Sequence, residues 1–172
     1  SNFDIDIEEA FRNPGNGLQQ SVVLSRNIIL EEDYHRWLVQ VGKVGDPGTS
    51  RAEHMIFRAF ERRGWRFPES RPPGLDLEYL ARVSGNEGGI EIDFFIRSRE
   101  IAIRCQGEYW HYKDDPTTEA GIVERMILES QGLTVVDILA QDTKTVERTD
   151  YVVALAVNGF EVDISGKLGV FR

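Results

Sequence analysis

The alternation of apolar and polar residues is clearest between residues 90 and 106, where it predicts two consecutive β-strands. In the first strand, one face is expected to carry Ile90, Ile92, Phe94 and Ile96, and the other Glu91, Asp93, Phe95 and Arg97. Asp93 is therefore expected to point away from the more apolar face. The second strand follows a short polar connector and ends at Gly107, with Arg104 and Gln106 on one side. If the two strands pair as a hairpin, Asp93 lies near these two side chains at one end of the sheet.

Helical spacing elsewhere predicts three helices around these strands. Ser50 followed by Glu53 is typical of a helix start, and the period that follows predicts a helix over about residues 50–63. Pro116 begins a second helix, which ends before Gly132 and carries an apolar stripe of Ile122, Val123, Met126 and Ile127. The remaining elements are a third helix over about 144–157 and strands over about 75–83, 133–138 and 160–164. From residue 50 the expected order is helix, three strands, helix, strand, helix.

Length and cysteine content predict a compact cytoplasmic protein. The 172 residues are enough for one domain with a buried core. No apolar run approaches the roughly 20 residues of a membrane span, and no cleavable signal sequence is visible. Cys105 is the only cysteine, which excludes an internal disulfide. The acidic residues 1–47 are expected to form a partly helical extension, with a helix over 28–41 and a boundary at the Gly-Asp-Pro-Gly of 45–48.

The charge of the chain bears on nucleic acid as a partner. The formal net charge of -9 would repel a phosphate backbone, whereas proteins that bind nucleic acid usually present a basic face. Residues 51–71 depart from this balance, because they contain six arginines against three glutamates, interleaved with Trp65 and Phe67. Arginine and aromatic side chains can bind phosphate and stack on bases. An exposed helix face has the same composition, so both interpretations remain open.

A short motif together with the order of elements resembles a known family. About a dozen residues after Asp93, a strand runs into Gly-Glu-Tyr-Trp-His at 107–111. Ser-Arg-Ala-Glu at 50–53, Gly-Trp-Arg-Phe at 64–67 and Glu124 extend the match. The chain thus resembles the PD-(D/E)XK nuclease superfamily and, within it, the very short patch repair endonucleases.

The resemblance implies a fold class and a domain organisation. The fold would be α/β, with a restriction-endonuclease-like core of helix, three strands, helix and strand over residues 48–140. Residues 1–47 would be an N-terminal addition. Residues 141–172 would be a C-terminal addition made of a helix and a strand. Both additions are candidate surfaces for protein partners.

The resemblance also implies Mg²⁺- or Mn²⁺-dependent hydrolysis of a DNA phosphodiester bond. Asp93 and the carbonyl of Cys105 would hold the metal. The catalytic residues around the scissile phosphate would be Glu53, Asp93, Gln106 and His111. Gln106 stands where the repair enzymes have a histidine, and an amide can orient a water but cannot take its proton. DNA contacts are expected from Arg51, Arg62, Arg63, Arg66, Arg104, Tyr109 and Trp110.

Departures from the family pattern leave alternatives to a nuclease site open. Arg104-x-Gln106 stands where most of these nucleases carry acid-x-lysine, and a fixed positive charge beside a divalent-ion site opposes metal binding. The repair enzymes also lack that acid, but they have a cysteine-based zinc site that this chain cannot form. Glu53 could merely complete a capping box, and Asp93 could be a solvated strand residue.

Three hypotheses about function therefore remain. The first is a metal-dependent endonuclease or nickase. The second is a catalytically degenerate nuclease-fold subunit of a larger phage or mobile-element assembly. The third is an unrelated α/β binding module that only mimics the motif.

Overall fold

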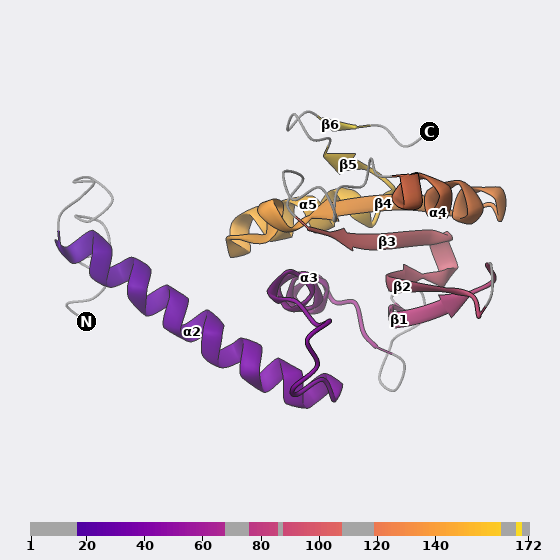
Figure 1. Cartoon of the computed structure of the whole chain (residues 1–172). Helices are drawn as coiled ribbons and strands as arrows, with labels where there is room; N and C mark the ends of the chain where they lie inside the picture. The colour runs from indigo at the N-terminus through magenta and orange to yellow at the C-terminus, as the bar shows by residue number, and fades with distance from the viewer. Residues whose placement is uncertain (1–16, 68–75, 86–87, 108–118, 163–167, 170–172) are drawn as a thin grey trace. The chain divides into compact units, whose positions relative to one another are not determined.

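The computed structural model describes residues 17–67, 76–85, 88–107, 119–162 and 168–169, which form two compact units, 1–49 and 50–172. In the first unit, helix α2 spans Gly17–Val41 (Figure 1). It begins earlier than the expected residue 28, because neither glycine nor proline interrupts the chain between residues 18 and 41. No helix in the described part of the chain combines the length and the hydrophobicity needed to cross a membrane.

The second unit is built on a mixed four-stranded sheet in the order β1-β2-β3-β4 (Figure 1). The strands are β1 (Glu78–Val83), β2 (Ile90–Ile96), β3 (Ile101–Gln106) and β4 (Thr134–Leu139). The first three are antiparallel neighbours, and β4 pairs parallel to β3. The helices are α3 (Arg51–Arg62), α4 (Glu119–Ser130) and α5 (Val146–Ala156). The expected order of helix, three strands, helix, strand, helix is confirmed.

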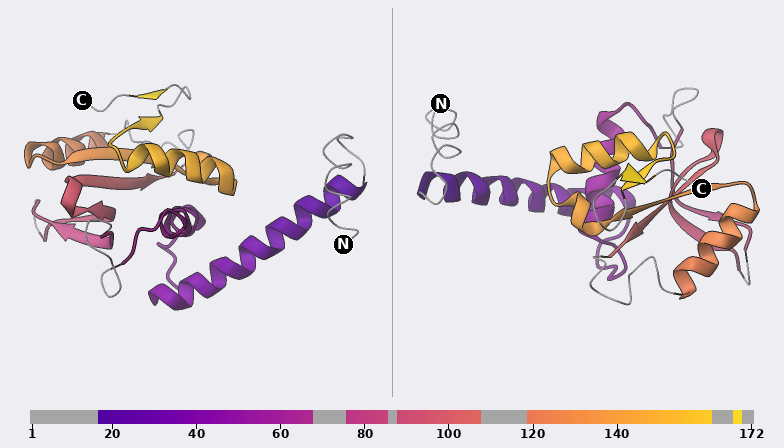
Figure 2. Two further views of the ribbon diagram at one scale, coloured as in Figure 1. Left: turned by 180° about the vertical axis from the view of Figure 1, so that it is seen from behind. Right: turned by 90° about the horizontal axis from the view of Figure 1, so that it is seen from above.

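Helices cover both faces of the sheet, with α4 on one face and α3 and α5 on the other (Figure 2). On the α4 side, Leu128 joins a buried cluster of strand residues made of Ala81, Ile90, Ile92, Phe95, Ala102 and Val135. On the α3 side, the core includes a group of aromatic rings, Phe57, Phe60, Tyr79 and Phe94. Helix α5 packs against α3 and belongs to the same compact unit as the sheet.

The alternation of β2 is interrupted at Asp93. Ile92 and Phe95 both belong to the cluster under α4, whereas Phe94 packs on aromatic rings of α3. The expected assignment of Phe94 and Phe95 to faces was therefore wrong. Leu80 lies on β1 opposite Asp93, between the pairs Tyr79↔Phe94 and Ala81↔Ile92, and its φ is 56°. A left-handed residue distorts the regular pleat, so side chains before and after it change faces.

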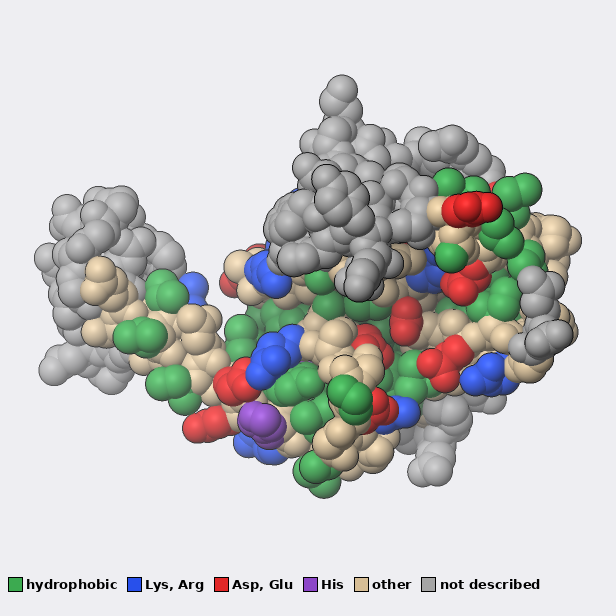
Figure 3. All heavy atoms as spheres, viewed as in Figure 1, with side chains coloured by type: hydrophobic (Ala, Val, Ile, Leu, Met, Phe, Trp, Pro, Cys, Tyr) green, Lys and Arg blue, Asp and Glu red, His purple; other side chains and the backbone are tan. Residues whose placement is uncertain are grey.

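Of the four residues in the predicted apolar stripe of α4, Ile127 packs against the buried cluster, whereas the other three are largely exposed. Ile122, Val123 and Met126 are 46%, 45% and 64% exposed, and Leu128 is the buried residue of the helix. The surface over α4 shows hydrophobic side chains beside acidic ones (Figure 3). The cause is that the sheet-facing side of the first turns of α4 is occupied by Glu124 and Arg125, which bond to charged residues of the strands.

The C-terminal segment forms a second, two-stranded sheet. Strand β5 (Glu161–Val162) pairs antiparallel with β6 (Leu168–Gly169). The expected strand over residues 160–164 is thus present as a shorter one, and its last two residues lie outside the described part of the chain. Strand β5 contacts β4 and α5, so it packs against the four-stranded sheet and one of its covering helices.

Candidate functional site

Glu53 is held at the start of α3 by two sets of hydrogen bonds. Ser50 is the N-cap, and its backbone N–H and hydroxyl donate to Glu53 Oε2 at 2.9 and 3.1 Å. The Glu53 N–H donates in return to Ser50 Oγ at 3.2 Å, which completes a capping box. The other oxygen, Oε1, accepts a hydrogen bond from the Tyr79 hydroxyl at 2.9 Å. Glu53 is only 6% exposed, so it caps the helix and also points inward toward the sheet.

Asp93 reaches the same region from β2. The ladder between β2 and β3 runs from Ile96 and Ile101 to Phe94 and Ile103. Beyond the end of this ladder, the Cys105 N–H donates to Asp93 Oδ2 at 2.7 Å. A carboxylate oxygen thus takes the place of a strand carbonyl where the two strands separate.

Burial and neighbouring charges perturb this site strongly. Burial raises the pKa of the Asp93 carboxyl to about 7, the Cys105 N–H opposes the shift, and the charges of Glu53, Glu91 and Glu124 reinforce it. Burial beside Asp93 and Glu53 also raises the pKa of the Cys105 thiol well above its usual range. Among the described residues, no basic side chain forms an ion pair with Asp93. The site is therefore rich in negative charge and poorly neutralised.

The oxygen donors of this site fit a hard divalent cation. Mg²⁺ is usually bound by one or two carboxylates, with the remaining ligands supplied by water and substrate phosphates. Asp93 and Glu53 supply the carboxylates. The N–H and C=O of one strand residue point toward the same neighbouring strand, so the Cys105 carbonyl is directed to the side on which Asp93 lies. No three His, Cys, Asp or Glu side chains among the described residues are grouped to hold a metal by themselves.

Arg104 lies on the opposite face of β3, in a buried ionic network. Its guanidinium is 4% exposed and donates to both oxygens of Asp137 on β4, at 2.7 and 3.0 Å. Gln106 Nε2 and Arg125 Nη1 donate to the same carboxylate at 3.1 and 2.8 Å. The Asp137 N–H donates to Glu161 of β5 at 2.8 Å, which ties the C-terminal strand to the network.

This network changes the interpretation of two predicted residues. Arg104 was expected to contact DNA, but a buried guanidinium that is bonded to Asp137 is not available to a phosphate. Its positive charge was expected to oppose a metal near Asp93, yet Asp137 neutralises much of that charge. Gln106 was expected beside Asp93, and its amide N–H is instead directed to Asp137.

Sequence reasoning missed Asp137, Arg125 and Glu161. The available signal was a charged residue in the middle of each of two apolar strands, Arg104 in one and Asp137 in the other. These two residues are directly paired in the parallel register of β3 and β4. A buried charge needs a partner, so the two could have been matched from the sequence once the parallel pairing was assumed.

The other predicted DNA contacts are divided between the surface and the undescribed segments. Arg51, Arg62, Arg63 and Arg66 are all exposed, on α3 or just after it. Arg62 forms an ion pair with Asp150 at 2.7 Å, and Arg66 donates to the backbone carbonyls of Glu61 and Trp65. Tyr109, Trp110 and His111 lie outside the described residues.

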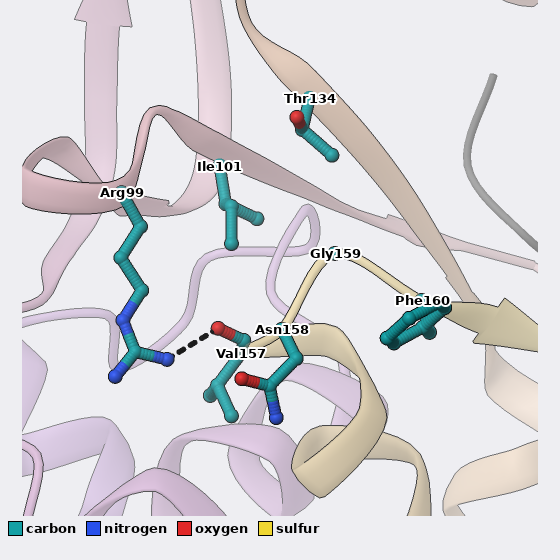
Figure 4. A pocket seen from close by; sticks show the side chains of 7 residues that line it. All are labelled: Arg99, Ile101, Thr134, Val157, Asn158, Gly159 and Phe160. Atoms are coloured by element: carbon teal, nitrogen blue, oxygen red, sulfur yellow. Dashed lines mark hydrogen bonds between the residues drawn. The ribbon is translucent and has the colours of Figure 1, made fainter.

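An open pocket of about 420 Å³ lies at the opposite end of the sheet (Figure 4). Arg99 reaches across it to donate to the Val157 carbonyl at 2.5 Å. Its lining includes Ile101 at the start of β3, whereas Cys105 lies near the end of that strand. The described residues that line the pocket include one charged side chain, Arg99, and no acid, histidine or cysteine.

No family model, no curated protein and no solved structure matches this chain. Its function is therefore inferred from the chemistry of the residues around Asp93.

Proposed function

We propose that this protein is a Mg²⁺- or Mn²⁺-dependent DNA endonuclease or nickase with a restriction-endonuclease-like core. The observation that carries the proposal is the proximity of two carboxylates, the buried Glu53 from α3 and the half-buried Asp93 from β2. Their charges act on each other and on Cys105, and Asp93 also accepts the Cys105 N–H. These groups come from three separate elements. Such a concentration of uncompensated negative charge is unfavourable for folding unless a cation or a proton neutralises it.

Each residue has a distinct role in the proposed reaction. Asp93, the Cys105 carbonyl and Glu53 would hold the metal. When bound, the metal would polarise the scissile phosphate and lower the pKa of an attacking water. Glu53 is kept in place by Ser50 and Tyr79. Gln106 donates to Asp137 in the network on the opposite face of β3, so it is given no role at the metal.

DNA is the proposed substrate because the basic residues lie near the same helix as Glu53. Arg51 is the first residue of α3, and Arg63 and Arg66 are exposed just beyond its end. They would provide a local positive surface on an otherwise acidic chain. His111, Tyr109 and Trp110 retain their proposed roles at the scissile phosphate and between base pairs.

A second candidate is a catalytically degenerate nuclease-fold subunit. It is favoured by Arg104 and Gln106, which stand where active family members carry an acid and a lysine and which both bond to Asp137. The exposed apolar residues of α4, Ile122, Val123 and Met126, would then contribute to a contact with another protein.

Plasmid nicking by the purified 172-residue chain separates the two candidates. With Mg²⁺ or Mn²⁺, we expect the parent to convert supercoiled plasmid to open circles, and Asp93→Asn and Glu53→Gln to lose about 100-fold or more of this rate. Glu91→Gln is the matched control, because Glu91 is an exposed carboxylate on the same strand. Absence of cleavage with either ion, or cleavage that survives Asp93→Asn, would exclude the endonuclease and favour the degenerate subunit.

A further inference from the structure

Tyr79 is fixed in the sheet by its ring and reaches the candidate metal site only through its hydroxyl. It pairs with Phe94 across the β1–β2 ladder, and the two ring centroids are 5.3 Å apart. The ring also meets Phe57 of α3 edge to face, at 5.6 Å. Because the ring is packed on two sides, its orientation is fixed. The hydroxyl donates a hydrogen bond to Glu53 Oε1 at 2.9 Å.

The hydrogen bond from Tyr79 fixes Oε1, the carboxylate oxygen of Glu53 that Ser50 does not bind. The capping box holds Oε2 through Ser50, which belongs to the same turn as Glu53. Tyr79 holds Oε1 from a different element of the fold. The orientation of the carboxylate relative to β2, and hence to Asp93, is therefore set by a tertiary contact.

The backbone of β1 is distorted at the next residue. Leu80 lies opposite Asp93 and adopts a φ of 56°, in the left-handed region that costs a branched residue about 1–2 kcal/mol. The regular pairs Tyr79↔Phe94 and Ala81↔Ile92 enclose this residue. Strain of this kind persists only where the surroundings impose it, and here it coincides with the two carboxylates.

We infer that Tyr79 is a positioning residue, which holds the Glu53 carboxylate in the orientation that allows Glu53 and Asp93 to share one divalent cation. The inference rests on the proposed function, because it assigns Tyr79 to the same metal site. Tyr79 acts through Glu53 and touches neither the cation nor the DNA. Residues that orient a metal ligand in this way generally change metal affinity by about 10–100-fold when they are replaced.

Direct Mn²⁺ binding to the 172-residue chain, measured by isothermal titration, tests the inference without using catalysis. Tyr79→Phe keeps the ring that packs on Phe94 and removes only the hydroxyl, so it is expected to fold. We expect its Mn²⁺ dissociation constant to rise about 10-fold or more. Tyr151→Phe, at an exposed tyrosine of α5, is the matched control and should bind as the parent does.

A double-substitution cycle shows whether Tyr79 acts through Glu53. If it does, adding Tyr79→Phe to Glu53→Gln causes no further loss of Mn²⁺ affinity. Equal affinity of Tyr79→Phe and the parent overturns the inference alone, as does an independent loss in the Glu53→Gln background. A parent chain that binds no Mn²⁺ overturns the proposed metal site itself and the inference with it.

Discussion

Replacing Asp93 by asparagine tests the electrostatics of the candidate site through protein stability. The substitution removes a half-buried negative charge beside Glu53 and keeps an oxygen that can accept the Cys105 N–H. Because the carboxylate is unfavourable where it lies, the loss of its charge should stabilise the folded protein. A group retained at a cost to stability is typical of a functional site.

The sign and the size of the effect follow from the pKa. Burial raises the pKa of Asp93 from its ordinary 3.8 to about 7, so between these values the folded state binds a proton that the unfolded state has released. The contribution of Asp93 to stability is therefore greatest below the lower pKa and is lost as the pH rises to about 7. Each pH unit in this window is worth about 1.4 kcal/mol. From about pH 5 to about pH 8, the loss amounts to about 2.5 kcal/mol.

Urea denaturation in the presence of a metal chelator measures this loss. We expect the free energy of unfolding of Asp93→Asn, relative to that of the parent, to increase by about 2.5 kcal/mol between about pH 5 and about pH 8. Glu32→Gln, which removes an exposed charge from α2, should show a change below about 0.5 kcal/mol. A difference between Asp93→Asn and the parent that is the same at both pH values would refute the argument that burial perturbs Asp93.

Two further substitutions test the backbone and the ionic network by chemical denaturation. Glu100 is exposed and left-handed at φ 54° and ψ 40°, so Glu100→Gly should raise the free energy of unfolding by about 0.5–1 kcal/mol. Ser98→Gly in the same turn, where φ is not positive, should lower it, and equal effects of the two would contradict the role given to the left-handed backbone. Asp137→Ala leaves Arg104 buried without its main partner and should cost about 3–5 kcal/mol. Asp150→Ala breaks an exposed ion pair and should cost below about 1 kcal/mol; a similar loss for both would argue against a buried network.

Features that depend on neighbours in the chain were predictable from the sequence. The start of α3 was predicted from Ser50 and Glu53, because a capping box closes within four residues. The order of helices and strands was predicted for a similar reason, since hydrophobic periodicity is a local property of each segment. The position of Asp93 on the second strand followed directly from that order.

Features that depend on distant partners were not predictable. The sequence predicted the apolar stripe of α4 but not the direction in which it faces, because the sheet offers Arg104 and Asp137 below this helix and charged residues of α4 turn toward them. The faces of β2 were misassigned beyond Asp93 because the distortion that changes them lies on the neighbouring strand.

The sequence by itself determined the elements, their order and the placement of Glu53 on a helix and Asp93 on a strand, because these depend on spacing and capping within short segments. Only the tertiary structure decided that Tyr79 joins Glu53, that the Cys105 peptide meets Asp93, and that Arg104 turns away to Asp137. The physical reason is that buried polar groups must find partners, and the available partners are set by strand register and by the packing of helices on the sheet.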